Sequence, residues 1–342
     1  MDFPQVFLFE GEESAAVSEL AAVVRDLGGD RPFAVTSERG LPLAEAIPAG
    51  ARVTPPPGAT KEWASSLGAR IRRSGANLVV AIGGGRCLDL GKLAAARAGV
   101  TMLTVPTQLS HDGLCSPVAV VGSGDGKTES LGAIAPRGVF LSLPTLLRAP
   151  IDSVRAGMGD LLANPLALRD WALAAERGLS EINRRAWDMS VESYTLIEPH
   201  LDSDPADTAT NAAFHRTLAD ALVLSGMAMI HAGTSRPASG AEHEISHAID
   251  ELYEGRALHG AQVAFGCIVS VALYGEDTDA FRKRLRCLGL PDRPEALGLS
   301  TEEMVKILLA APDTRPGRFT ILEDAALDED SARLLVDGIW NN

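Results

Sequence analysis

Three of the seven histidines in the chain, His243, His247 and His259, fall within seventeen positions. His243 and His247 are four residues apart, which places two side chains on one face of a helix, and residues 242–252 have the rhythm of an amphipathic helix. His259 opens the apolar segment 258–273, which predicts a second, buried helix. Imidazole is the commonest side-chain metal ligand, and one carboxylate would complete a catalytic site with an open coordination position. The alternative is a helix whose two histidines bind no metal.

Asp160 is the candidate for this carboxylate. It follows Gly157-Met158-Gly159, and we expect it to begin an amphipathic helix with Asn164 one turn later on the same face. An aspartate at a helix start ordinarily caps the helix or complements its dipole, which is the alternative here. The metal interpretation is economical because Asp160 lies in the same predicted helical region as the histidines.

A glycine turn follows the strongest strand pattern, residues 77–82. This strand leads directly into Gly83, Gly84 and Gly85 at the start of a predicted helix. Glycines let the backbone approach an anion and the helix N-terminus attracts it, so this turn can hold a phosphate. Glycines also serve tight turns for steric reasons alone, which leaves both explanations open.

The next predicted strand, residues 100–106, offers hydroxyl groups near its carboxyl end. Open α/β sheets bind ligands at this edge. The hydroxyl residues are Thr104, Thr107 and Ser110. Two neighbouring strand ends therefore present polar groups to one predicted crevice.

Length and composition narrow the class of protein. The 342 residues suit two domains, and 46% hydrophobic with 22% charged residues is typical of a globular protein. The formal net charge of −14 argues against a nucleic-acid partner, since a polyanion would be repelled. No membrane-span or export pattern is found, and the four cysteines are widely spaced, so we expect a cytoplasmic protein with reduced thiols and no membrane anchor.

Strand and helix patterns alternate in the first part of the chain. The expected helices are 12–28, 61–75 and 86–99, and the expected strands are 32–36, 77–82 and 100–106. This alternation predicts a parallel sheet in an N-terminal Rossmann-like domain, residues 1–150. Residues 120–129 predict a hairpin that turns at Gly124-Asp125-Gly126. Helical patterns then predict an all-α, helical-bundle domain over 151–342.

Several motifs together resemble the sn-glycerol-1-phosphate dehydrogenase family, within the superfamily of iron-containing alcohol dehydrogenases, glycerol dehydrogenases and dehydroquinate synthases. The similarity covers roughly residues 30–325. The motifs are GGGRCLDLGK, VPTQLSHDGLCSP, AGMGDLLAN, SRPASGAEHEISHAID, LHGAQVAFG and RPGRFTIL.

The resemblance implies a role for each matching residue. Asp160, His243 and His259 are the implied ligands of one divalent metal, zinc by preference over iron or nickel. His247 is implied beside the nicotinamide and the substrate, and Asp112 in hydrogen bonding to a substrate hydroxyl. The implied cofactor-binding residues are Gly83, Gly84, Gly85, Asp89, Thr104, Thr107, Ser110 and Ser37.

The family pattern implies reduction of dihydroxyacetone phosphate to sn-glycerol 1-phosphate with NAD(P)H. We expect a small phosphorylated triose or polyol as ligand and a homo-oligomer as the assembly. Arg236 and Arg318 are candidates for binding the substrate phosphate, because a guanidinium matches phosphate geometry. Surface ion pairs are the alternative for both. Asn164 is a further substrate candidate.

Ser37 bears on the choice of cofactor. Related alcohol dehydrogenases that reject NADP often carry an acidic residue at this position, which would repel a 2′-phosphate. Ser37 does not repel it and Arg39 can pair with it, so we expect both NADH and NADPH to be used.

Three other functions remain open at this point. One is a dehydrogenase for an unphosphorylated substrate such as glycerol. Another is a cyclase resembling dehydroquinate synthase, although that branch usually has a glutamate where Asp160 stands. The third is a non-catalytic binding protein, whose mark would be a lost metal ligand.

Overall fold

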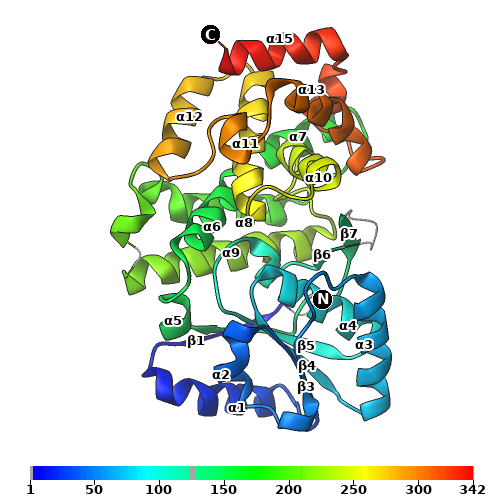
Figure 1. Cartoon of the computed structure of the whole chain (residues 1–342), viewed down its shortest axis with the longest axis vertical. Helices are drawn as coiled ribbons and strands as arrows, with labels where there is room; N and C mark the ends of the chain where they lie inside the picture. The colour runs from blue at the N-terminus through cyan, green and yellow to red at the C-terminus, as the bar shows by residue number, and fades with distance from the viewer. Residues whose placement is uncertain (1–2, 123–127, 209, 342) are drawn as a thin grey trace.

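The computed structural model describes residues 3–122, 128–208 and 210–341. A parallel sheet flanked by helices forms one end of the molecule, and helices form the other (Figure 1). The predicted fold class, a Rossmann-like α/β part followed by a helical part, is confirmed. Within the described ranges, no helix combines the length and apolar character that a membrane span requires.

The main sheet has six parallel strands in the order β1-β8-β5-β4-β2-β3. These strands are β1 (Gln5–Phe9), β2 (Pro32–Thr36), β3 (Arg52–Val53), β4 (Leu78–Gly83), β5 (Thr101–Pro106) and β8 (Gly138–Ser142). β4 and β5 run in register up to the pair Gly83 and Pro106. The glycine turn and the segment after β5 therefore emerge side by side.

Helices cover both faces of the sheet. They are α1 (Ala16–Asp26), α2 (Leu41–Ala44), α3 (Lys61–Ser74) and α4 (Gly85–Ala98). Alternate residues of β4 point to opposite faces: Val79 and Ala81 belong to the core beneath α3 and α4, and Val80 and Ile82 to the core beneath α1 and α2.

β1 was not predicted, because only a helix was expected in the first thirty residues. The strand is held by parallel pairing with β8, from Gln5 opposite Gly138 to Phe9 opposite Ser142. A short edge strand with a partner so far along the chain has no local pattern that distinguishes it.

The predicted hairpin is present as a separate antiparallel pair, β6 (Val118–Gly122) and β7 (Thr128–Gly132). Its expected turn, Gly124-Asp125-Gly126, lies outside the described residues. The pair lies between the sheet and the helical part (Figure 1).

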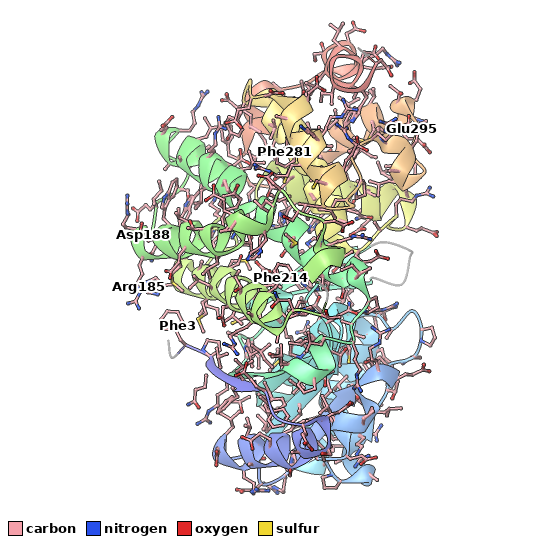
Figure 2. All side chains as sticks on the ribbon, turned by 90° about the vertical axis from the view of Figure 1, so that its left-hand side faces the viewer. Phe3, Arg185, Asp188, Phe214, Phe281 and Glu295 are labelled. Atoms are coloured by element: carbon pink, nitrogen blue, oxygen red, sulfur yellow. The ribbon has the colours of Figure 1, made fainter. Side chains whose placement is uncertain are left out.

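The helical part follows β8. Its helices are α5 (Leu143–Leu146), α6 (Ile151–Leu162), α7 (Asn164–Glu176), α8 (Arg184–Ile197), α9 (Ala212–Ala232), α10 (Ala241–Tyr253), α11 (His259–Leu273), α12 (Thr278–Cys287), α13 (Thr301–Ala310), α14 (Ile321–Ala325) and α15 (Glu329–Trp340). Arg185 and Asp188 of α8 project from the outer surface, whereas Phe214 of α9 is buried (Figure 2).

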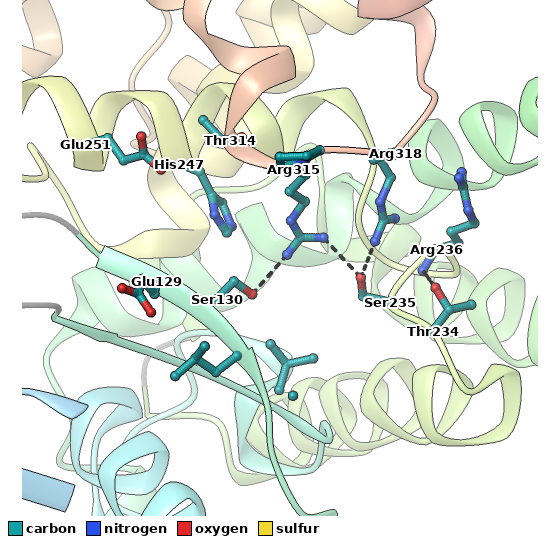
Figure 3. Close-up of a pocket in the computed structure, with 15 residues that line it drawn as sticks. Glu129, Ser130, Thr234, Ser235, Arg236, His247, Glu251, Thr314, Arg315 and Arg318 are labelled. Carbon is teal, nitrogen blue, oxygen red and sulfur yellow. Dashed lines mark hydrogen bonds between the residues drawn. The ribbon is translucent and has the colours of Figure 1, made fainter. Parts of the chain in front are cut away.

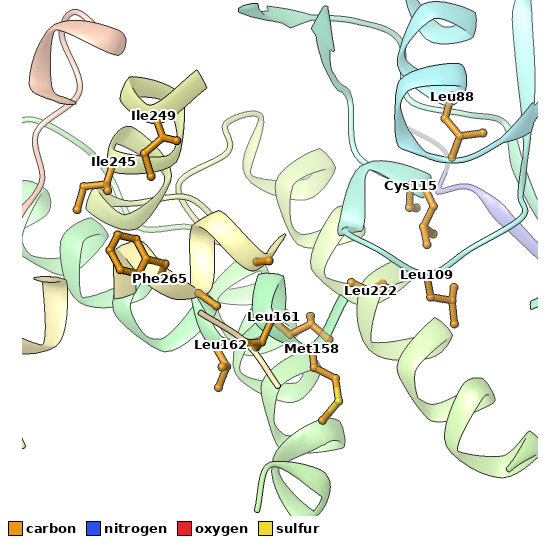
Figure 4. Packing of buried hydrophobic residues seen from close by; sticks show 14 of the residues in the cluster. Leu88, Leu109, Cys115, Met158, Leu161, Leu162, Leu222, Ile245, Ile249 and Phe265 are labelled. Carbon is orange, nitrogen blue, oxygen red and sulfur yellow. The ribbon is translucent and has the colours of Figure 1, made fainter. Parts of the chain in front are cut away.

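One buried apolar cluster joins the two parts. It extends from Leu88 of α4 and Cys115, through Met158 of α6, to Ile245 of α10 and Phe265 of α11 (Figure 4). Because the parts share this core, the division near residue 150 stays a prediction.

Candidate active site

Asp160, His243 and His259 come together from three helices, α6, α10 and α11. The Oδ1 atom of Asp160 lies 3.8 Å from Nε2 of His243 and 3.9 Å from Nε2 of His259. All three atoms lie within 4.8 Å of one another. One carboxylate and two imidazoles at this separation can hold a divalent ion in common.

Close packing between α6 and α11 brings Asp160 to the histidines. A Cβ atom on Gly159 would lie 2.5 Å from the carbonyl oxygen of Gly260, and one on Gly260 would lie 1.9 Å from that of Ala156. The two glycines therefore let the helix backbones approach more closely than side chains would permit. The next residue after Gly159 is the predicted ligand.

The predicted position of Asp160 at the start of a helix is wrong. The residue lies in the last turn of α6 and does not begin a helix; the next helix, α7, starts at Asn164 with Pro165 in its first turn. Proline is tolerated at that position because its missing N–H has no partner in a first turn. A carboxylate at the carboxyl end of α6 gains nothing from the helix dipole, so the capping explanation no longer applies.

The environment of Asp160 fits a metal ion. Oδ2 accepts a hydrogen bond from the backbone N–H of Asp112 at 2.9 Å, and Oδ1 is buried without a partner among the described residues. Burial and the nearby Asp112 carboxylate raise the pKa of Asp160, while burial lowers the pKa of His243 and His259. A divalent cation would satisfy the orphaned oxygen, and neutral imidazoles supply the lone pairs it needs.

A cavity of about 200 Å³, the histidine cavity, opens in front of these groups and is lined by Asp112, His243, His247 and His259. Burial raises the pKa of Asp112 to about 6, despite a hydrogen bond from Ser225 that acts to lower it. His247 lies one turn after His243, and burial lowers its pKa too. The predicted catalytic pair, His247 and Asp112, thus faces the same space as the candidate ligands.

Asn164 was predicted to contact the substrate, but it does not line the histidine cavity. It is 1% exposed, and its amide nitrogen donates to Oγ of Ser193 at 2.7 Å and to Oγ of Ser225 at 3.2 Å. Ser225 in turn donates to Asp112 at 2.9 Å. The expected substrate contact is therefore corrected to a support behind Asp112.

The glycine turn opens onto a cleft of about 830 Å³, the glycine cleft, lined by Ser37, Gly84, Gly85, Ser110 and His259. Gly85 begins α4, so backbone N–H groups at the helix N-terminus face the cleft. A Cβ atom on Gly85 would lie 1.9 Å from Nε2 of His111. Glycine is therefore required at position 85 because the helix start packs directly against His111, and the cleft beside it is large enough to hold a dinucleotide.

The other predicted cofactor residues divide into two groups. Gly83 ends β4 against Cys87 and Ser37, and Thr107 lines an adjoining cavity of about 480 Å³ together with Ser37 and Arg39. Thr104, in contrast, is fully buried and donates to the carbonyl oxygen of Leu114 at 2.7 Å. Its predicted cofactor contact is corrected to a role inside the sheet.

Asp89 was predicted to bind the cofactor, but it does not line the glycine cleft. Its carboxylate pairs with Lys92 at 3.1 Å and accepts the backbone N–H of Val120 at 3.1 Å. Lys92 donates to the carbonyl oxygen of Val118 at 2.7 Å. The pair therefore fastens β6 to α4, and Asp89 borders the histidine cavity instead of the glycine cleft.

Three arginines lie side by side in the lining of a third cavity of about 630 Å³, the arginine cavity (Figure 3). Arg315 donates to Oγ of Ser239 at 2.8 Å and Oγ of Ser130 at 3.2 Å, and Arg318 donates to Oγ of Ser235 at 2.7 Å. The third is Arg236, which donates to the carbonyl oxygen of Phe319 at 3.1 Å.

The charges of Arg236, Arg315 and Arg318 are not neutralised by a contact. None of the three forms an ion pair with a carboxylate in the part of the chain that the structure describes. Burial and the neighbouring Arg315 and Arg236 lower the pKa of Arg318 to about 10. Among the described residues, the surface ion pairs considered for Arg236 and Arg318 are therefore absent, and a bound anion would relieve the repulsion between the arginines.

Comparison with known proteins decides the family. The chain is 36% identical over 274 residues to glycerol-1-phosphate dehydrogenase [NAD(P)+] of Cenarchaeum symbiosum, covering 80% of this chain and 76% of that one. The protein of that name from Methanoculleus marisnigri is 39% identical over 272 residues, covering 78% and 72%. The chain belongs to the glycerol-1-phosphate dehydrogenase family. The predicted resemblance is confirmed.

Two further comparisons concern a part of the chain and the fold. The profile of the iron-containing alcohol dehydrogenase family matches residues 43–150. The fold resembles that of a probable glycerol dehydrogenase from Sinorhizobium meliloti 1021, with a TM-score of 0.79 at 20% identity, covering 98% of this chain and 96% of the other. It also resembles a sulfoacetaldehyde reductase from Bifidobacterium kashiwanohense solved with NAD+, with a TM-score of 0.71 at 16% identity, covering 99% and 98%.

Two residues that line the site, Arg315 and His111, were not predicted from the sequence. Arg315 lies three positions before Arg318 in RPGRFTIL, and His111 precedes Asp112 in SHDG, so both stand inside motifs already recognised. Arginine and histidine at those positions carry no spacing signal of their own. Only the structure shows that Arg315 and His111 line the cavities.

Proposed function

We propose that this chain reduces dihydroxyacetone phosphate to sn-glycerol 1-phosphate with NAD(P)H. The observation that carries the proposal is the order of the three cavities. His259 lines both the glycine cleft and the histidine cavity, and His247 and Arg315 line both the histidine and arginine cavities. A dinucleotide, a reacting carbonyl and a phosphate can therefore bind in sequence along one continuous site.

Asp160, His243 and His259 would hold the metal ion, for which we propose zinc because a mixed carboxylate and imidazole set suits it. When bound, the ion supplies a Lewis acid for a carbonyl oxygen. The dinucleotide supplies the hydride. The side chains of the protein must still orient the substrate and supply a proton.

The protein groups have separate tasks in this reaction. Arg236, Arg315 and Arg318 bind the substrate phosphate at the far end of the site. The carboxylate of Asp112, braced by Ser225, accepts a hydrogen bond from a substrate hydroxyl. His247 borders the same cavity and is placed to relay a proton to the new hydroxyl oxygen, since a neutral imidazole has one donor and one acceptor nitrogen.

We also propose that the protein acts in the cytoplasm as a homo-oligomer. Reduced thiols suit that compartment, and all four cysteines are unpaired: Cys87, Cys115, Cys267 and Cys287.

The substrate proposal is tested by comparing dihydroxyacetone phosphate with dihydroxyacetone. We expect kcat/KM to be about a hundredfold or more higher for the phosphorylated ketone, because the arginines contribute binding energy only when a phosphate is present. Chiral analysis of the product is expected to give sn-glycerol 1-phosphate. Equal kcat/KM values for the two ketones would favour the dehydrogenase for an unphosphorylated substrate, and the opposite enantiomer would contradict the proposed stereochemistry.

The cofactor proposal, that both NADH and NADPH are used, is tested at Ser37. Its Oγ caps the turn that follows by accepting the N–H of Gly40 at 3.3 Å. Aspartate can also make this cap, so Ser37→Asp should fold normally while its charge repels a 2′-phosphate. We expect kcat/KM for NADPH to fall about tenfold to a hundredfold and that for NADH to change little.

Steady-state kinetics with each cofactor measures both effects, and Ser37→Asn is the uncharged control. A wild-type kcat/KM for NADPH that is about a thousandfold below that for NADH would contradict use of both cofactors. An equal loss for both cofactors in Ser37→Asp would instead indicate damage to the turn.

A further inference from the structure

Glu242 stands immediately before the candidate ligand His243 and is fully buried, with 0% exposure. Its Oε1 atom lies 2.9 Å from Nδ1 of His243 and accepts the backbone N–H of Gly240 at 2.6 Å. We propose that Glu242 is a positioning residue that holds His243 in the tautomer and orientation required for metal binding. This inference rests on the metal site proposed above.

The tautomer follows from the two contacts at Oε1. The backbone N–H of Gly240 can only donate, so Oε1 of Glu242 is an acceptor in that contact. When Glu242 is ionised its oxygens can only accept, so the Nδ1 atom of His243 carries the proton that points to the same oxygen. In a neutral imidazole this leaves the lone pair on Nε2, the atom that faces Oδ1 of Asp160 at 3.8 Å. The ring is therefore preset for coordination through Nε2.

The other ligands are supported less directly. Oδ2 of Asp160 receives one backbone N–H, from Asp112, and Nδ1 of His259 lies 3.4 Å from the hydroxyl of Ser246. Only His243, among the three candidate ligands, has a carboxylate on its second ring nitrogen within the described residues. Such a partner orients the ring and raises its basicity as a ligand.

The burial of Glu242 costs free energy, because one of its oxygens has no partner. Its Oε2 atom is buried without a hydrogen-bond partner among the described residues, which is destabilising for a carboxylate. Glu244, two positions later on α10, is equally buried and also has one unpartnered oxygen, but its other oxygen accepts from Thr320 at 3.0 Å and contacts no ligand. Glu244 is therefore a matched control.

The test is zinc affinity of the full-length protein, measured by competition with a chromophoric chelator after metal removal. We expect Glu242→Ala to bind zinc about 10- to 100-fold more weakly than wild type, and Glu242→Gln, which keeps an acceptor oxygen, to recover part of that loss. We expect Glu244→Ala to bind zinc as wild type does. The visible spectrum of bound Co²⁺ should change in Glu242→Ala and not in Glu244→Ala, since it reports ligand geometry.

Zinc affinity of Glu242→Ala within about threefold of wild type, or an equal loss in Glu244→Ala, overturns the inference. If Glu242→Ala does not fold, NMR of the zinc-free wild type labelled at histidine decides: a proton on Nδ1 of His243 supports the inference, and one on Nε2 overturns it. A wild-type protein that binds no zinc contradicts the proposed metal site itself, which separates the two failures.

Discussion

Replacing Asp160 with asparagine is expected to lower kcat/KM for dihydroxyacetone phosphate by about a thousandfold or more, because the metal contributes several kcal/mol of transition-state stabilisation. Asparagine keeps the size of the side chain and an acceptor for the N–H of Asp112. It removes the negative charge that Oδ1 presents to His243 and His259. We therefore expect most of the bound metal to be lost without loss of the fold.

Metal analysis of the purified protein and steady-state kinetics check this prediction, with one zinc ion per chain expected in wild type. Asp292→Asn is the control, since Asp292 is 7% exposed and pairs with Arg286 at 2.6 Å without contributing to any of the three cavities. We expect the control to keep its metal and its activity. Full activity in Asp160→Asn would remove the basis for the proposed site.

Replacing Arg315 with methionine is expected to lower kcat/KM for dihydroxyacetone phosphate by about a hundredfold, because a charged hydrogen-bonding partner of the phosphate is lost. The value for dihydroxyacetone should change little. Arg315 is the most informative of the three arginines, since it alone lines both the histidine and the arginine cavities. Methionine preserves much of the apolar stem, so that packing is retained.

Comparing the two ketones in the same variant separates lost phosphate binding from general damage. Arg315→Lys serves as the second control: it keeps the charge but not the fork that reaches Ser130 and Ser239, and we expect an intermediate loss. An equal fall in kcat/KM for both ketones would place Arg315 in support of the fold and would count against the phosphate role of the arginine cavity.

Features carried by short stretches were predictable from the sequence. The four-residue spacing of His243 and His247 is a property of a single helix, and the strand-to-glycine junction at Gly83 is continuous in the chain. Both appear where they were expected. The residue types already suggested Asp160 and His259 as metal ligands with His243, and the family motifs supported this choice because they match the same positions.

Features that depend on distant partners were not predictable. β1 forms because β8 pairs with it. The hydroxyl of Thr104 donates to the carbonyl oxygen of Leu114 and is therefore not available to a ligand. Asn164 was expected to face the substrate from the position of Asp160 in a helix, but its amide group is buried and donates to Ser193 and Ser225.

The residue types in this protein already specified the chemistry available to it: imidazoles, a carboxylate, a glycine turn and guanidinium groups. Which of them meet was decided by packing between α6 and α11, where Gly159 and Gly260 let two backbones touch, and by the fold of the Arg315 segment onto Ser235 and Ser239. A local sequence pattern sets the conformation of a few residues. The distances between groups on different helices depend on how the whole core closes, and that is why the site could be inferred in part but assembled only in three dimensions.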